Sequence, residues 1–184
     1  HGKVARHDTR EGRELLVPSV PGSFFAPSGP LDLSPDEIAA LAHAAGGAPP
    51  KFREATPEDL ERTCADFARA AERARRAGFD AVELHGAHGY LFSSFLSPAS
   101  NRRQDAWGGP VENRARLLVE TLRACKQSAG PDFPIWCRIY ATEFGTPGGI
   151  TPEDAVRTAE LLEQAGADAI HVSAYANPLG AGFT

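Results

Sequence analysis

The sequence predicts an α/β fold in which parallel strands alternate with helices. Two copies of one pattern indicate it, because the frame G-x-D-A-[apolar]-x-[apolar] begins at Gly78 and again 88 positions later at Gly166. A helix opened by Thr-Pro-Glu-Asp precedes each copy, at 56–59 and at 151–154. A regular alternation of helical and short apolar segments is typical of βα repeats.

The helices are predicted from their first turns, their apolar faces and their ends. In the Thr-Pro-Glu-Asp openings, threonine caps free backbone N–H groups, proline suits the first helical position, and the acids favour the positive end of the helix. Apolar residues then recur with helical periodicity. One helix carries Leu60, Cys64, Phe67, Ala68 and Ala71 on one face, and the next, which begins near 112–114, carries Leu117, Leu118, Thr121, Leu122 and Cys125. Glycines favoured at left-handed C-caps follow the helices, namely Gly78, Gly130 and Gly166.

Short strands are expected after these helices, at roughly 80–85, 134–140 and 169–174. They are mostly apolar rather than alternating, which fits strands covered on both faces. The order along the chain is therefore helix, strand, helix, strand, helix, strand.

The spacing of the repeat favours a (β/α)8 TIM barrel. The 88-residue repeat spans two βα units, so eight units would need ~350 residues, within the range of such barrels with insertions. The chain would supply about half of the barrel. The rival architecture, a doubly wound sheet, usually has a glycine-rich phosphate turn after its first strand. The sequence has no G-x-G-x-x-G, and the G-x-x-G of Gly86 and Gly89 is too weak to indicate one.

Residues 10–55 differ from the rest and are rich in Pro, Gly, Ser and Ala. We expect an excursion on the barrel surface around one short helix near 35–45, which begins at Ser34-Pro35-Asp36-Glu37. The excursion would be a lid or an interface, or an insertion without function; both interpretations stay open. Residues 1–184 would form one partial barrel domain that includes this excursion.

Composition narrows the class of protein. The 184 residues are 42% hydrophobic, and no apolar run approaches the ~18 residues of a membrane helix, so a cytoplasmic protein without membrane contact is expected. The net charge of -5 argues against nucleic acid as the main partner. The three cysteines are scattered, which predicts buried free thiols. A sequence without methionine that opens on HGKVAR suggests a segment of a longer protein, in which an oligomer is possible.

The strongest candidate site follows the first predicted strand, where His85, His88 and Tyr90 lie close together in sequence. Parallel α/β folds build active sites where strands end. Imidazole N–H groups can hold an oxyanion or polarise a carbonyl, and a tyrosine hydroxyl can donate a proton. A zinc site is disfavoured and no metal is expected, because His-x-x-His has no third ligand nearby in sequence.

Arg138 is the second candidate, because it lies inside an otherwise apolar strand. A buried charge needs a partner. An anionic ligand would be one, and a structural ion pair with Glu83 or Glu143 would be the alternative. His171 on the last strand is expected to be structural. The segment 101–109 is expected to be architectural, with its arginines and aspartate tying the loop through charge-assisted bonds.

One long stretch resembles a known family. GFDAVELHGAHGYLFSSFLSPASNRRQDAWGGPVENRARLL contains H-x-x-[HN]-x-Y, FLSP, N-x-R-x-D-x-x-GG and ENR. This stretch resembles the fourth strand, loop and helix of the old yellow enzyme family of FMN-dependent oxidoreductases, which includes ene-reductases and 2,4-dienoyl-CoA reductase-like enzymes. The likeness continues through Arg138 in the fifth strand to HVSAYANP in the sixth, over roughly 55–178. The opening HGKVAR resembles the piece after the family's third strand.

The resemblance implies roles for the candidate residues. His85 and His88 would hydrogen-bond the electron-withdrawing oxygen of a small-molecule substrate, and Tyr90 would give a proton to its α-carbon. Arg138 would lie by the pyrimidine edge of the flavin. NAD(P)H would reduce FMN, and flavin N5 would then pass hydride to the β-carbon of an activated alkene.

The resemblance also implies parts that this sequence lacks. The family's phosphate site comes from loops after the seventh and eighth strands, so the isolated segment is expected to be inactive and to hold FMN poorly. An iron–sulfur subgroup exists, and its 4Fe-4S cysteines would lie beyond Thr184.

Two other functions stay open at this point. One is a flavin-independent barrel lyase or aldolase that uses the histidines, although no lysine on the three strands supports a Schiff base. The other is a non-catalytic, barrel-derived fragment.

Overall fold

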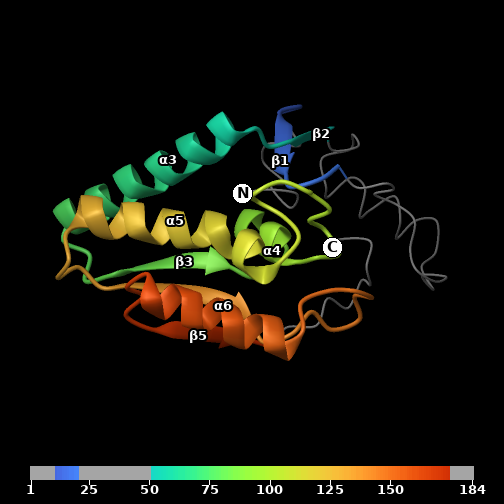
Figure 1. The fold of residues 1–184 in the computed structure, drawn as a ribbon. Coiled ribbons are helices and arrows are strands. Elements are labelled where there is room, and N and C mark those ends of the chain that lie inside the picture. Colours follow the sequence, from blue (N-terminus) through green and yellow to red (C-terminus); the bar gives the residue numbers. More distant parts are fainter. Residues whose placement is uncertain (1–10, 21–50, 175–184) are drawn as a thin grey trace, which may run out of the picture.

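The computed structural model describes residues 11–20 and 51–174, and its centre is a three-stranded parallel sheet. The strands stand in the order β3-β4-β5, with the bounds Val82–Gly86, Ile135–Tyr140 and Ile170–Ser173. Figure 1 shows β3 and its neighbours running in the same direction. The prediction of parallel neighbouring strands is confirmed, with ends shifted by one or two residues. The α/β fold class is therefore correct.

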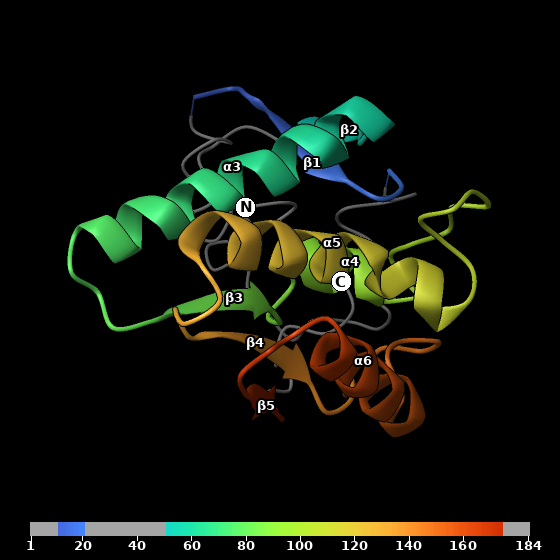
Figure 2. The same cartoon turned by 60° about the vertical axis from the view of Figure 1, so that its left-hand side comes forward.

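Long helices cover one face of this sheet. These helices are α3 (Pro57–Arg76), α5 (Val111–Ala129) and α6 (Pro152–Gln164). The α5 helix contacts β3 and β4, α6 contacts β4, and α3 packs on α5 as a further layer (Figure 2). No helix in the described ranges has both the length and the apolar character needed to cross a membrane.

The β4 strand divides its side chains between two environments. Ile135, Cys137 and Ile139 are buried towards the helices, at 2% exposure or less. Because successive side chains of a strand alternate, Trp136 and Arg138 lie on the opposite face, and both are only half-buried. The face away from the helices is therefore the one that carries polar groups.

Both Thr-Pro-Glu-Asp sequences begin helices as predicted, and each forms a capping box. The hydroxyl of Thr56 accepts from the backbone N–H of Asp59, whose carboxylate accepts from the backbone N–H of Thr56. Thr151 and Asp154 make the same exchange at the start of α6. The glycines after the helices all have positive φ, as a left-handed helix end requires: Gly78 at 85°, Gly130 at 93° and Gly166 at 96°.

The structure contains one helix that the sequence does not predict. The α4 helix, Leu91–Leu96, is only six residues long and buried throughout. The hydroxyl groups of Ser93 and Ser94 donate back to the carbonyl of Tyr90, so the polar residues of the turn satisfy its backbone. Six residues are too few for a helical period to appear in the sequence, and packing against α5 and β3 stabilises this helix instead.

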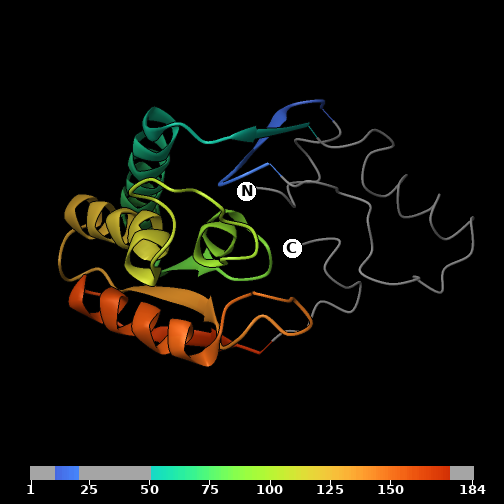
Figure 3. The same cartoon turned by 45° about the vertical axis from the view of Figure 1, so that its right-hand side comes forward.

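A second, smaller sheet was also absent from the expectation. The strands β1 (Glu14–Val17) and β2 (Lys51–Glu54) pair in parallel, and Figure 3 shows them beside the start of α3. They flank most of the excursion that we expected at 10–55. The short helix expected near 35–45 lies outside the described residues.

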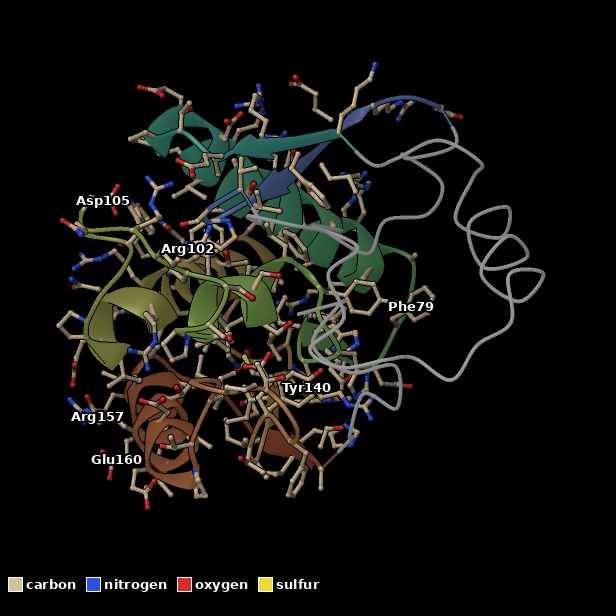
Figure 4. All side chains as sticks on the ribbon, turned by 90° about the vertical axis from the view of Figure 1, so that its right-hand side faces the viewer. Phe79, Arg102, Asp105, Tyr140, Arg157 and Glu160 are labelled. Atoms are coloured by element: carbon tan, nitrogen blue, oxygen red, sulfur yellow. The ribbon has the colours of Figure 1, made fainter. Side chains whose placement is uncertain are left out.

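The segment 101–109 ties the parts together, in agreement with its predicted architectural role. Asn101 donates to the carbonyl oxygens of Phe95 and Trp107. Arg103 is held by Asp105 and donates to the carbonyl of Ala55, just after β2. Figure 4 shows Arg102 and Asp105 on this loop.

The three cysteines are free, as predicted. Cys125 and Cys137 are buried, and burial raises the pKa of each thiol to about 12. Cys64 is partly exposed and lies 3.3 Å from the hydroxyl of Thr121.

We predict that Asp59→Asn destabilises the protein in a pH-dependent way. Asp59 is buried, and its hydrogen bonds with Arg53 and with the backbone of Thr56 hold the pKa of its carboxyl far below the ordinary value. A depressed folded-state pKa contributes stability above pH ~4 that is lost as the pH falls. We expect the substitution to cost about 1 kcal/mol at pH 7, and the difference from the wild type to shrink towards pH 2, measured by urea unfolding.

The matched control is Asp66→Asn, which breaks an exposed ion pair with Arg69 on the same helix. Exposed pairs contribute little, so its unfolding free energy should follow the wild type at every pH. Equal pH dependence of the Asp59 variant and the wild type would contradict the role assigned to this carboxylate.

Candidate active site

The polar face of the sheet carries a row of three residues. The register places His85 of β3 opposite Arg138 of β4, and Arg138 opposite His171 of β5. Because the strands are parallel, the three Cα atoms are level across the sheet near its carboxyl edge. The topology therefore brings together residues that are 86 positions apart in the sequence.

The close approach of β3 and β4 beside this row requires a glycine. A Cβ atom on Gly86 would lie 2.7 Å from the carbonyl oxygen of Arg138, which is closer than real Cβ contacts. In the sequence Gly86 belongs only to a weak G-x-x-G, whereas in the structure its missing side chain allows two strands to approach each other.

The chain then turns sharply and carries two more side chains back to His85. His88 has a φ of 59° and Gly89 a φ of 73°, both in the left-handed region. After this turn, the ring centroid of His88 lies 4.8 Å from that of His85. The ring centroid of Tyr90 lies 4.9 Å from that of His85. Tyr90 is the N-cap residue of α4, so the buried helix fixes the position of the Tyr90 backbone. The structure thus brings His85, His88 and Tyr90 into one cluster.

Two further residues contact this cluster and were not identified from the sequence. The hydroxyl of Ser173, at the end of β5, lies 2.8 Å from Nε2 of His88. The ring centroid of Tyr140, at the end of β4, lies 5.9 Å from the ring centroid of His88. Figure 4, which looks onto the carboxyl ends of the strands, shows Tyr140 near the middle of this side. Their positions at the ends of predicted strands could have indicated them, because side chains at the ends of parallel strands lie at the same edge of the sheet.

Both histidines are held in the neutral form near pH 7. Burial lowers the pKa of His85, and the positive charge of Arg138 lowers it further. The same two causes, in the same order, lower the pKa of His88. A neutral imidazole keeps one N–H donor and one acceptor nitrogen.

Arg138 has no salt bridge with either predicted partner. Its Nε atom is buried without a hydrogen-bond partner. The carboxylate of Glu83 accepts instead from Trp136 and His171, and that of Glu143 accepts from the backbone N–H of Ile150. The structural ion pair considered for Arg138 is therefore not formed among the described residues. His171, expected to be structural, contacts Glu83 and lies level with Arg138.

Within the described part of the chain, no group of three or more His, Cys, Asp or Glu side chains is arranged to hold a metal ion. The charged and polar groups at this edge are instead one arginine, imidazoles, hydroxyls and one carboxylate. Such a set suits an organic ligand with hydrogen-bond acceptors.

Comparison with known proteins identifies the family. Residues 26–177 match the model of the NADH:flavin oxidoreductase / NADH oxidase family. The chain belongs to this family. The cluster and Arg138 all fall inside the matched region.

Individual relatives agree with this assignment. An NADH oxidase from Thermoanaerobacter brockii is 47% identical over 122 residues, which cover 66% of this chain and 19% of that protein. An NADPH dehydrogenase from Geobacillus thermodenitrificans is 40% identical over 177 residues, which cover 94% of this chain and 47% of that protein. The solved structure of an old yellow enzyme homologue from Zymomonas mobilis superposes with a TM-score of 0.69 at 25% identity, over 93% of this chain and 44% of that one. The chain thus spans at most about half the length of these relatives.

We predict that Arg138→Gln raises the pKa of both His85 and His88. The substitution removes a positive charge that disfavours their protonation, while burial keeps both pKa values below that of an exposed histidine. Titration of the imidazole C–H signals by NMR measures the shift. Arg157→Gln, on the outer side of α6 (Figure 4), is the matched control and should leave both values unchanged. Unchanged histidine pKa values in the Arg138 variant would contradict this electrostatic coupling.

We also predict that the positive φ of His88 makes the stability of the protein depend on which residue replaces it. Asparagine tolerates a φ of about +60°, whereas a β-branched residue there is strained. His88→Val should therefore be less stable than His88→Asn by about 1–2 kcal/mol in denaturant unfolding. Equal stability of the two variants would indicate that the turn relaxes out of the left-handed region.

Proposed function

We propose that the protein carrying this chain is an FMN-dependent oxidoreductase that uses NAD(P)H to reduce an activated C=C bond, of the enone or enoate type. The observation that carries the proposal is the cluster of His85, His88 and Tyr90 beside Arg138, whose buried Nε has no hydrogen-bond partner among the described residues. Family membership supports it, because relatives are named NADH oxidase and NADPH dehydrogenase.

The polar edge of the sheet fits a flavin. Arg138 offers a guanidinium whose buried Nε lacks a partner, and such a group is stabilised by a ligand with acceptor atoms and negative charge. We assign Arg138 to the pyrimidine edge of FMN, where positive charge favours the reduced, anionic ring. When bound, FMN would supply the hydride that is added to the β-carbon of the alkene.

The remaining chemistry belongs to side chains of this chain. His85 and His88, held neutral, donate N–H groups to the carbonyl oxygen of the substrate and draw electron density from the conjugated alkene. Tyr90 transfers its hydroxyl proton to the α-carbon. The left-handed turn and the buried α4 helix orient these groups before the substrate arrives.

We place β3, β4 and β5 as strands 4 to 6 of an eight-stranded barrel. The parallel order supports this placement, as do helices on one face and polar residues on the other. The substrate would be a small molecule rather than a nucleic acid. The two deeply buried thiols are consistent with a reducing compartment such as the cytoplasm.

The direct test is spectroscopic. The full-length protein, incubated with FMN and then freed of unbound flavin by gel filtration, should retain flavin absorption that is bleached by NADH or NADPH under anaerobic conditions and restored by an enone. A protein that retains no flavin after gel filtration would contradict the proposal and would favour flavin-free barrel chemistry.

We predict that Tyr90→Phe separates the two halves of the reaction. The hydroxyl acts only when the alkene is protonated, so alkene reduction should slow by roughly 10²–10⁴-fold, the contribution of a general acid. Reduction of the flavin by NAD(P)H should stay nearly unchanged. Stopped-flow measurement of each half-reaction tests this, and equal impairment of both halves would rule out the proton-donor role.

A further inference from the structure

The one carboxylate on the polar face of the three strands has two donors on a single oxygen. Trp136 Nε1 donates to Oε2 of Glu83 at 2.7 Å, and His171 Nδ1 lies 2.8 Å from the same oxygen. The three residues come from three different strands, so the contacts span the whole sheet. Because a carboxylate is only an acceptor, His171 must carry its hydrogen on Nδ1.

Arg138 lies on the middle strand, β4, two residues beyond Trp136. In the register, Arg138 is opposite His171 of β5 and opposite His85 of β3. Glu83 lies two residues before His85 on β3. Although burial opposes it, the hydrogen bonds from His171 and Trp136 lower the pKa of the Glu83 carboxyl, and the charge of Arg138 adds to this effect. The register makes Glu83 and Arg138 diagonal neighbours on adjacent strands, within reach of long side chains, and a carboxylate and a guanidinium that meet often form a direct bidentate pair. Yet Arg138 Nε stays unpaired while Glu83 is held elsewhere.

We propose that His171 and Trp136 are positioning residues that hold Glu83 away from Arg138, so that the guanidinium stays available to an anionic or electron-rich ligand. The inference rests on the proposed function, in which that ligand is FMN. Without the two donors, the carboxylate would swing onto Arg138 and occupy the donors that the flavin needs. His171 thereby acts on the cofactor through Glu83 rather than by contact.

The test measures the dissociation constant for FMN of the full-length protein by fluorescence titration. His171→Phe keeps a ring but removes the donor, and we expect FMN to bind about tenfold more weakly, which corresponds to about 1.4 kcal/mol. The midpoint potential of the bound flavin should become more negative. His171→Gln keeps an N–H donor and should bind FMN within about twofold of the wild type.

The decisive variant combines His171→Phe with Glu83→Gln. A neutral amide does not compete as a counter-ion for Arg138, so the double variant should regain wild-type FMN affinity and midpoint potential. If His171→Phe acted only through loss of packing, FMN affinity would be low in the single variant and in the double variant alike. Trp136→Phe, again with and without Glu83→Gln, provides the same comparison if His171→Phe does not fold, as judged by circular dichroism.

The outcomes distinguish this inference from the function on which it rests. If Arg138→Gln leaves FMN affinity unchanged, the assignment of Arg138 to the flavin is wrong. If Arg138→Gln weakens binding but His171→Phe does not, the positioning role is overturned. Weak binding by His171→Phe that Glu83→Gln fails to rescue also overturns it, because the effect is then merely structural.

Discussion

The parallel register of β3, β4 and β5 is the constraint on which the candidate site depends. It makes His85, Arg138 and His171 level, although each belongs to a different βα unit. The register requires a close approach at Gly86, where any larger residue would meet the backbone of Arg138. It is stabilised from the other face, where Ile135, Cys137 and Ile139 are buried against helices. Packing on one face thus positions chemistry on the other.

The turn after β3 adds the second half of the cluster. A non-glycine residue at positive φ is uncommon and costs energy, and here it is the histidine whose ring returns to His85. The strain is offset nearby, because α4 is buried throughout and Asn101 and Arg103 tie the following loop to the helix and to β2. The loop therefore supports the position of the cluster.

Electrostatics at this edge depend on which groups the charged side chains contact. The carboxylate of Glu83 is engaged by Trp136 and His171 rather than by Arg138. Burial, and then the charge of Arg138, lowers the pKa of both His85 and His88, which favours neutral imidazoles. A guanidinium that the Glu83 carboxylate does not engage suits a ligand that gains negative charge.

The sequence by itself determined the elements with local signals. Capping boxes, helix-ending glycines and apolar strands all depend on neighbours within a few residues, and the positions of α3, α5 and α6 followed from them. The dense run from His85 to Tyr90 pointed to the site for the same reason. Only the tertiary structure decided that Arg138 pairs with neither Glu83 nor Glu143, that Ser173 contacts His88, that β1 and β2 form a sheet, and that α4 is buried. Each of these depends on residues that are distant in sequence, and no local pattern encodes which of several possible partners a side chain will meet when the strands align.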